Sequence, residues 1–268
     1  MVGMKALSLM QPAPVESGEW ALSRMRGRDG VALIVPDRFP AVVRIMHELT
    51  EDIGPDNGEY IPRAVRWNET LPTYLKSGPS AYLEQEVEPY NTEQGVLTRS
   101  IVATLLPLLT SATTTPQECL YGLWSGHGGL HQTSRGVFAF YAEDISEDEQ
   151  RDRTAKLQQE ADRRTAETTA VLERCPEVSW WGGRDAYLMQ GPLDAIDCLG
   201  AADSFTDDET DPLGPMWWWP KDRAWFIGNE IDDAWSYLAG PQSLIDDVLR
   251  LSESGAVEAY PVTFGSRW

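Results

Sequence analysis

Five of the eleven tryptophans of this chain lie within one short segment, residues 216–240. Each indole removes a very large apolar area from water when it is buried. A soluble protein must therefore either place such a group in its core or use it as a recognition surface. The sequence leaves both alternatives open, and either one makes this segment the centre around which the rest of the chain is organised.

The order of residues in this segment predicts a turn, a hairpin and a helix. The run Trp217, Trp218 and Trp219 ends at Pro220, which has no backbone N–H, so we expect the run to stop in a turn. Aromatic and β-branched residues then predict an antiparallel hairpin over residues 224–239. A Gly-Pro pair and the apolar spacing after it predict a core-facing helix from residue 241 onward.

The same segment carries a resemblance to a known family. The pattern Trp-Trp-Pro-x-Asp-Arg-x-Trp-Phe, followed by Glu-Ile-Asp, an aromatic strand, a glycine and an amphipathic helix, resembles a family of uncharacterised actinobacterial proteins. Further stretches agree with it, at residues 44–47, 65–67, 123–128, 187–193 and 244–260. The resemblance covers most of the chain, and it implies no activity, cofactor or catalytic residue.

Hydrophobic patterning along the whole chain predicts an α+β fold, with helices packed on a mixed or mainly antiparallel sheet. We expect a strand at residues 31–35, a strand or a helix at 41–49 with its β-branched residues favouring the strand, a loop at 53–62, and a core helix from residue 98 that Pro107 disturbs near its end. We expect a single domain over residues 1–268. Within it, the charged stretch 145–174 lacks Gly and Pro and predicts an exposed helical excursion, with a partner-binding or dimerising helix as the alternative.

Composition excludes several classes of function. The chain has 42 acidic and 22 basic residues, for a formal net charge of -20. Such a field repels nucleic-acid backbones and anionic membrane surfaces, and it attracts a basic protein, which is the partner we expect. No stretch has the roughly 18 apolar residues that a membrane span needs. Three widely spaced cysteines fit neither a disulfide framework nor a zinc site, so we expect a cytoplasmic location and no cofactor.

Few side chains suggest a chemistry. His127 and His131 are four residues apart, but the glycines between them argue against a helix, and no third metal ligand is identifiable, so no metal site is predicted. Glu230 and Asp232 lie near several indoles, as the paired carboxylates of a glycosidase would. The structural interpretation is that Asp222 accepts backbone N–H groups while Arg223 pairs with Glu230 or Asp232.

Two functional hypotheses follow. The first is a non-catalytic interaction protein, inhibitor-like or immunity-like, that presents an acidic, Trp-rich surface to a basic partner. The second is an enzyme or small-ligand-binding protein whose pocket lies between the His127 loop and the segment from Trp217 to Asp232. A flat acidic face with exposed indoles favours the first, and convergent polar groups in a pocket favour the second.

Overall fold

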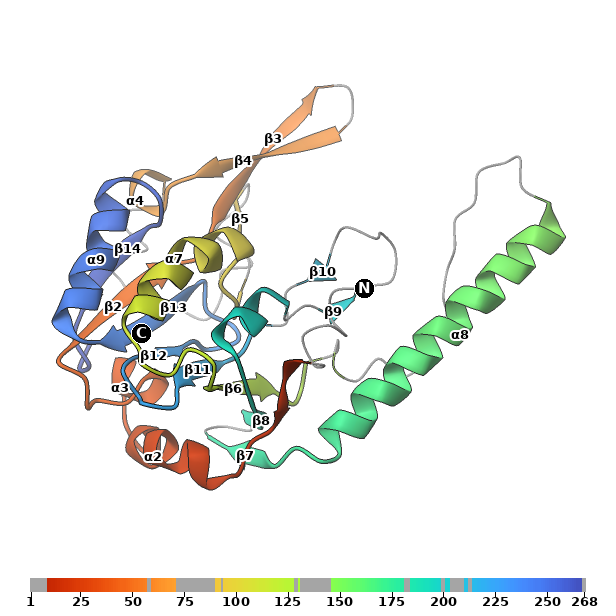
Figure 1. Cartoon of the computed structure of the whole chain (residues 1–268). Coiled ribbons are helices and arrows are strands. Elements are labelled where there is room, and N and C mark those ends of the chain that lie inside the picture. The colour runs from red at the N-terminus through yellow and green to blue at the C-terminus, as the bar shows by residue number, and fades with distance from the viewer. Residues whose placement is uncertain are drawn as a thin grey trace.

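The computed structural model describes residues 9–56, 59–70, 90–92, 94–127, 130, 146–180, 184–198, 201–202, 210–211 and 214–266. Its main body is a sheet with helices on both faces, and one long helix extends away from that body (Figure 1). The predicted α+β class is confirmed, and every strand pairing in the sheet is antiparallel.

The main sheet has nine strands, which run in the order β1-β8-β6-β11-β12-β13-β2-β14, with β7 also paired to β8. Their bounds are β1 Gln11–Pro12, β2 Ala41–Met46, β6 Cys119–Trp124, β7 Glu177–Ser179, β8 Asp185–Gly191, β11 Trp217–Pro220, β12 Phe226–Gly228, β13 Trp235–Gly240 and β14 Ala259–Val262. The central strands β11, β12 and β13 all come from the tryptophan-rich segment, so the hairpin predicted there is confirmed. That segment forms the middle of the sheet.

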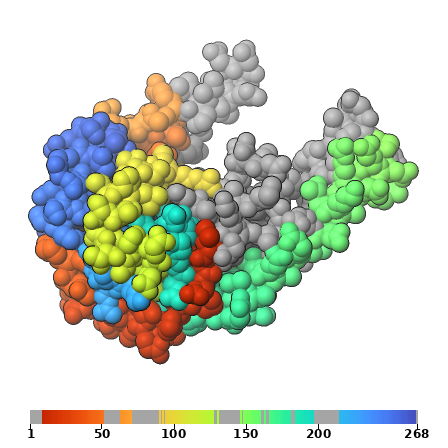
Figure 2. All heavy atoms as spheres, in the orientation of Figure 1, coloured from red at the N-terminus to blue at the C-terminus, as the bar shows by residue number. Residues whose placement is uncertain are grey.

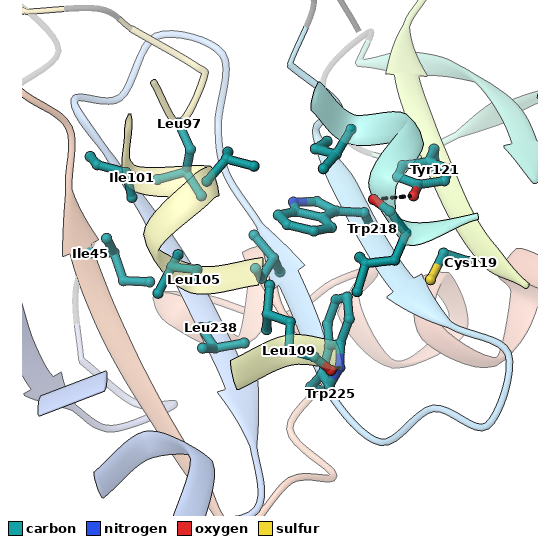
Figure 3. Packing of buried hydrophobic residues seen from close by; sticks show 14 of the residues in the cluster. Ile45, Leu97, Ile101, Leu105, Leu109, Cys119, Tyr121, Trp218, Trp225 and Leu238 are labelled. Carbon is teal, nitrogen blue, oxygen red and sulfur yellow. Dashed lines mark hydrogen bonds between the residues drawn. The ribbon is translucent and has the colours of Figure 1, made fainter. Parts of the chain in front are cut away.

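Helices cover both faces of this sheet. One face packs against α7 (Arg99–Ser111), α9 (Gln242–Glu253) and the short 3-10 helix η1 (Leu193–Cys198). The other face packs against α2 (Glu16–Met25) and α3 (Val31–Ile34). Side chains alternate between the faces of a strand, so β11 contributes indoles to both layers of the core. Figure 3 shows the first layer, in which Trp218 and Trp225 lie beside Leu109 of α7.

The strand predicted at residues 31–35 is wrong, because this apolar run forms the single helical turn α3. Gly30 precedes it with a φ of 61°, a left-handed conformation that glycine adopts without steric cost. The Val31 N–H donates to the carbonyl of Ser266, and the Ala32 N–H donates to that of Phe264. Contacts with the C-terminal segment therefore replace a strand ladder, and a continuous apolar run suits a buried helix equally well.

The loop predicted at residues 53–62 is also wrong. A hairpin is formed there by β3 (Leu49–Asp56) and β4 (Glu59–Val65), and β5 (Tyr90–Thr92) pairs with the start of β3. The register shifts between Ile53 and Asp56, where the chain contains a Gly-Pro pair. Turn-forming residues thus sit inside an irregular strand instead of ending it. Three short elements complete this description, namely α4 (Trp67–Thr70) and the paired strands β9 (Ala201–Ala202) and β10 (Thr210–Asp211).

The predicted helical excursion is present as α8 (Glu147–Leu172), the longest helix described. It begins at the Ser146 N-cap, whose hydroxyl accepts the Glu149 N–H, and its last residue, Leu172, is buried in the core. The rest of α8 extends beyond the body of the protein (Figures 1 and 2). Within the described part of the chain, none of the helices has the length and apolar character needed to cross a membrane.

Candidate functional site

The tryptophans of the central strands belong to the core. Trp217 and Trp219 face α2 and α3, while Trp218 faces α7, and all three are at most 2% exposed. Trp218 meets Trp225 edge to face at a centroid distance of 5.4 Å, and the Trp225 Nε1–H donates to the Leu109 carbonyl at 3.0 Å. The predicted recognition surface of exposed indoles is therefore wrong for this segment, and the core alternative is correct.

Asp222 organises the turn after β11. Its carboxylate accepts the Thr114 N–H at 2.7 Å, the Ala224 N–H at 3.1 Å and the Thr113 hydroxyl at 2.8 Å. Partial burial raises the pKa of Asp222, but these hydrogen bonds outweigh burial and hold the pKa below its usual value. The predicted structural role of Asp222 is confirmed, because it ties this turn to the segment after α7.

Arg223 does not pair with either predicted carboxylate. Its guanidinium lies over the indole of Trp20 on α2, with 4.9 Å between Cζ and the ring centroid. Arg184, which the sequence did not single out, holds both acids instead. The Nε of Arg184 lies 2.5 Å from Glu230 Oε1, and its Nη2 lies 2.6 Å from Asp232 Oδ2. The identity of the cation was missed because Arg184 precedes β8, far away in sequence.

The Arg184 bridge also connects to the His127 loop. The guanidinium lies 5.9 Å from the Trp124 ring centroid, and Trp124 meets the His127 imidazole edge to face at 6.5 Å. The structure thus gathers His127, Glu230 and Asp232 at one end of the sheet, with Trp124 and Arg184 between them. His131 lies outside the described residues. Among those that are described, no three His, Cys, Asp or Glu side chains are grouped to hold a metal.

The ion pairs of Arg184 with Glu230 and Asp232 restrict the reactions that this cluster could catalyse. Burial lowers the pKa of Arg184, but Glu230 and Asp232 outweigh it and raise that pKa above its ordinary value. Glu230 is 5% exposed, and its second oxygen accepts the Asp232 N–H at 2.8 Å. A glycosidase needs one protonated acid and one separate carboxylate. Here both carboxylates bind the same guanidinium, that of Arg184. This arrangement suits a structural ion-pair cluster better than catalysis by one protonated acid and one carboxylate.

A second polar cluster lies buried beside the first. The Arg44 guanidinium stacks over Trp235 and Tyr237, with Cζ 5.0 and 5.7 Å from the two ring centroids. Asp233 is 7% exposed, and burial together with Glu230 and Asp232 raises its pKa to about 8 against the opposing effect of Arg44. Asp233 Oδ2 has no hydrogen-bond partner among the described residues.

Burial of Tyr237 raises its pKa to about 12, so the phenol stays neutral at physiological pH. Nothing in the sequence separates Asp233 from the acids around it, because Asp232 and Asp233 are adjacent in the chain and differ only in exposure. The cluster was therefore missed. Its signal is structural, because Asp233 just before β13 and Arg44 on the neighbouring strand β2 are both buried.

Three further candidate nucleophiles, Ser236, Cys119 and Cys175, are buried. Ser236 Oγ lies 2.9 Å from His47 Nε2, but both residues are at most 1% exposed, so a substrate cannot reach the hydroxyl. Burial, assisted by Asp222, raises the pKa of the Cys119 thiol to about 12, and burial raises that of Cys175 to about 11 despite Arg174. Neither thiol forms the thiolate that nucleophilic catalysis needs.

Comparisons of this chain with models of protein families, with curated proteins and with solved structures find no match.

Proposed function

We propose that this chain is a non-catalytic, cytoplasmic interaction protein that presents an acidic surface to a basic protein partner, and that α8 carries the contact. The observation that supports this most directly is the exposure of α8, which extends from the body (Figure 2), while the five tryptophans of the segment 216–240 are buried in the core. Neither nucleic acid nor a membrane surface belongs to the proposal, because the net charge of -20 opposes both.

The fold does not need an α8 of this length. Among the side chains of α8 that the structure describes, Val171 and Leu172 at the C-terminal end pack in the core, while Leu157 in the middle is 49% exposed. Ion pairs between Arg153 and Glu149 and between Arg163 and Glu167 stabilise the helix along its own surface. Such exposed pairs contribute about 0.3–0.5 kcal/mol each, which does not replace core packing. A long helix held in this way is typical of a docking element.

Charge on α8 favours a basic partner. Glu147, Asp148 and Glu149 form its first turn, at the end farthest from the body (Figure 1). The side chain of Asp148 is 93% exposed, and its ion pair with Arg151 at 3.2 Å is an exposed contact on the helix surface that a partner could replace. Together with the overall acidity, this end steers a basic protein toward α8 and makes the contact sensitive to salt.

The test is capture of partners from the host by the tagged full chain, with a photo-crosslinking residue in place of Leu157. We expect a stoichiometric protein of high isoelectric point that salt releases and that crosslinks at position 157. Reversing the charges of Glu147, Asp148 and Glu149 to lysine should abolish its capture. A matched control reverses Asp246, Asp247 and Glu253 on α9 and should retain it. Loss in both variants, or retention in both, would contradict the role of α8.

A second candidate function rests on the cluster at the end of the sheet. Trp124, Arg184 and the two acids it binds converge there beside His127, as a small-ligand site between this loop and the central strands would require. Native mass spectrometry of the protein from its host tests this. A bound small molecule that His127→Ala removes would favour it, and a mass equal to the bare chain would count against it.

A further inference from the structure

A short segment of the chain crosses the end of the main sheet. Residues 94–97, which we call the strap, lie between β5 and α7 and pack on the loop that joins β12 to β13. The Gly95 N–H donates to the Asp233 carbonyl at 2.8 Å, and the Asn229 side-chain amide donates to the Gly95 carbonyl. At the α7 end of the strap, Leu97 is buried in the core (Figure 3). Two hydrogen bonds and one buried side chain therefore hold the strap in place.

Glycine allows the strap to lie directly on the loop. Gly95 has a φ of 70°, and a Cβ built on it would lie 2.7 Å from the Ile231 Cα. Gly214, just before β11, gives the strap a second close contact, because a Cβ there would lie 2.6 Å from the Val96 Cβ. At Gly95 the strap thus covers the loop with backbone alone, because this residue has no side chain to add.

The loop under the strap holds the buried acid Asp233, whose Oδ2 has no hydrogen-bond partner in the described part of the chain. The described charged or titratable groups that face it come from its own loop and from two strands, namely Glu230, Asp232, Arg44 of β2 and Tyr237 of β13. Arg184 binds both acids of the loop. Burial and these two acids outweigh the attraction of Arg44, so a proton on Asp233 avoids a buried negative charge.

The strap is the least costly route by which water could reach Asp233. An ionised carboxylate needs water or a partner, because an isolated buried charge is very unfavourable. Arg44 and Tyr237 lie on β2 and β13, and each of these strands is paired along both edges. Water could enter from their side only by breaking the main sheet. Movement of the strap instead breaks the hydrogen bonds of Gly95 and leaves the sheet intact, as expected of a local opening.

We propose that the strap is a pH-sensitive cover, which ionisation of Asp233 lifts from the loop so that water enters the end of the sheet where Arg184 holds Glu230 and Asp232. This device is independent of the proposed role of α8. With the strap closed, the pKa of Asp233 is about 8, and with the strap open the hydrated carboxyl returns toward its ordinary 3.8. Opening therefore releases a proton between these values. The open fraction rises with pH in that window and is constant outside it.

The test is amide hydrogen exchange of the full chain, followed by NMR at Gly95. Its N–H bonds to the main-chain carbonyl of Asp233, so Asp233→Asn keeps this acceptor. We expect the protection factor of Gly95 to fall about tenfold per pH unit between about pH 5 and pH 7, as release of one proton requires. In D233N it should not change with pH. Asn229→Ala, which removes the second hydrogen bond, should lower protection at every pH and retain the pH dependence.

Asp29→Asn is the matched control, because it removes an exposed acid far along the chain from the loop, and it should behave as the parent protein does. Amides of the central strands β6 and β11 report global unfolding and should exchange more slowly than Gly95. Protection of Gly95 that is independent of pH would overturn the proposal, as would a pH dependence that D233N retains. Exchange of Gly95 as slow as that of the central strands would also overturn it, because the strap would then open only when the whole protein unfolds.

Discussion

Asp233→Asn should make the folded protein less sensitive to alkaline pH. Burial and the neighbouring acids Glu230 and Asp232 raise the pKa of Asp233 from its ordinary 3.8 to about 8, with Arg44 opposing them. The folded state therefore holds a proton on Asp233 that the unfolded state has released. Between these two pKa values the free energy of unfolding falls as the pH rises, because the folded state binds more protons than the unfolded state. Below about pH 4 and above about pH 8 this contribution is constant.

The magnitude follows from the same two pKa values. One pKa unit corresponds to about 1.4 kcal/mol, so the loss across the whole window is on the order of 5 kcal/mol. Asparagine resembles the protonated carboxylic acid in size and has no charge to bury. The variant should therefore equal the parent protein at pH 4 to within about 1 kcal/mol, and it should be several kcal/mol more stable at pH 8.5.

Urea denaturation of the full chain at a series of pH values measures this effect. The difference between the variant and the parent isolates Asp233 from all other titrating groups, which both proteins share. Asp29→Asn supplies the control, because it removes the same charge from an exposed position after α2. The reasoning is refuted if D233N and the parent protein lose stability in parallel as pH rises, or if D29N gains as much as D233N.

Substitutions in the core and at the ion pairs of Arg184 give further predictions. A Cβ at Gly122 would lie 2.3 Å from Trp217 Cε3, so Gly122→Ala should lower the free energy of unfolding by about 1–3 kcal/mol, and adding Trp217→Phe should recover part of it in urea melts. Arg184→Gln leaves Glu230 buried without its cation and should cost about 3 kcal/mol, whereas Arg184→Lys should cost less; thermal melting compares them. The Cys119 thiol, with its pKa raised to about 12, should resist alkylation at pH 8 until urea unfolds the chain, as peptide mass mapping would reveal.

Secondary-structure elements could be predicted correctly where the hydrophobic pattern fits only one type of element. The hairpin of β12 and β13 and the helix α9 follow from alternation and from apolar spacing, and both are present. The run at α3 could not be assigned correctly, because four buried apolar residues suit a helical turn and a strand equally. Its helical form depends on carbonyls of Phe264 and Ser266, which lie more than two hundred residues away in the chain.

The candidate site was harder to predict than the fold. The sequence singled out Glu230, Asp232 and the His127 loop, and the structure brings them to one end of the sheet. It assigned the wrong arginine, because local spacing favoured Arg223, whereas the cross-sheet neighbour is Arg184. Pairing across a sheet depends on strand order, and strand order is a global property that residue spacing does not report.

The position of β2 in the sheet has a consequence for how the protein is made. This strand, Ala41–Met46, is synthesised early, yet both of its partners, β13 and β14, come from the last part of the chain. On a ribosome β2 therefore remains unpaired at both edges, with its apolar side chains exposed, until the segment that contains β13 and β14 has emerged. Contacts of such long sequence separation fold slowly and leave aggregation-prone edges exposed in the meantime. We expect the nascent chain to depend on a chaperone that binds β2 until β13 and β14 have been synthesised.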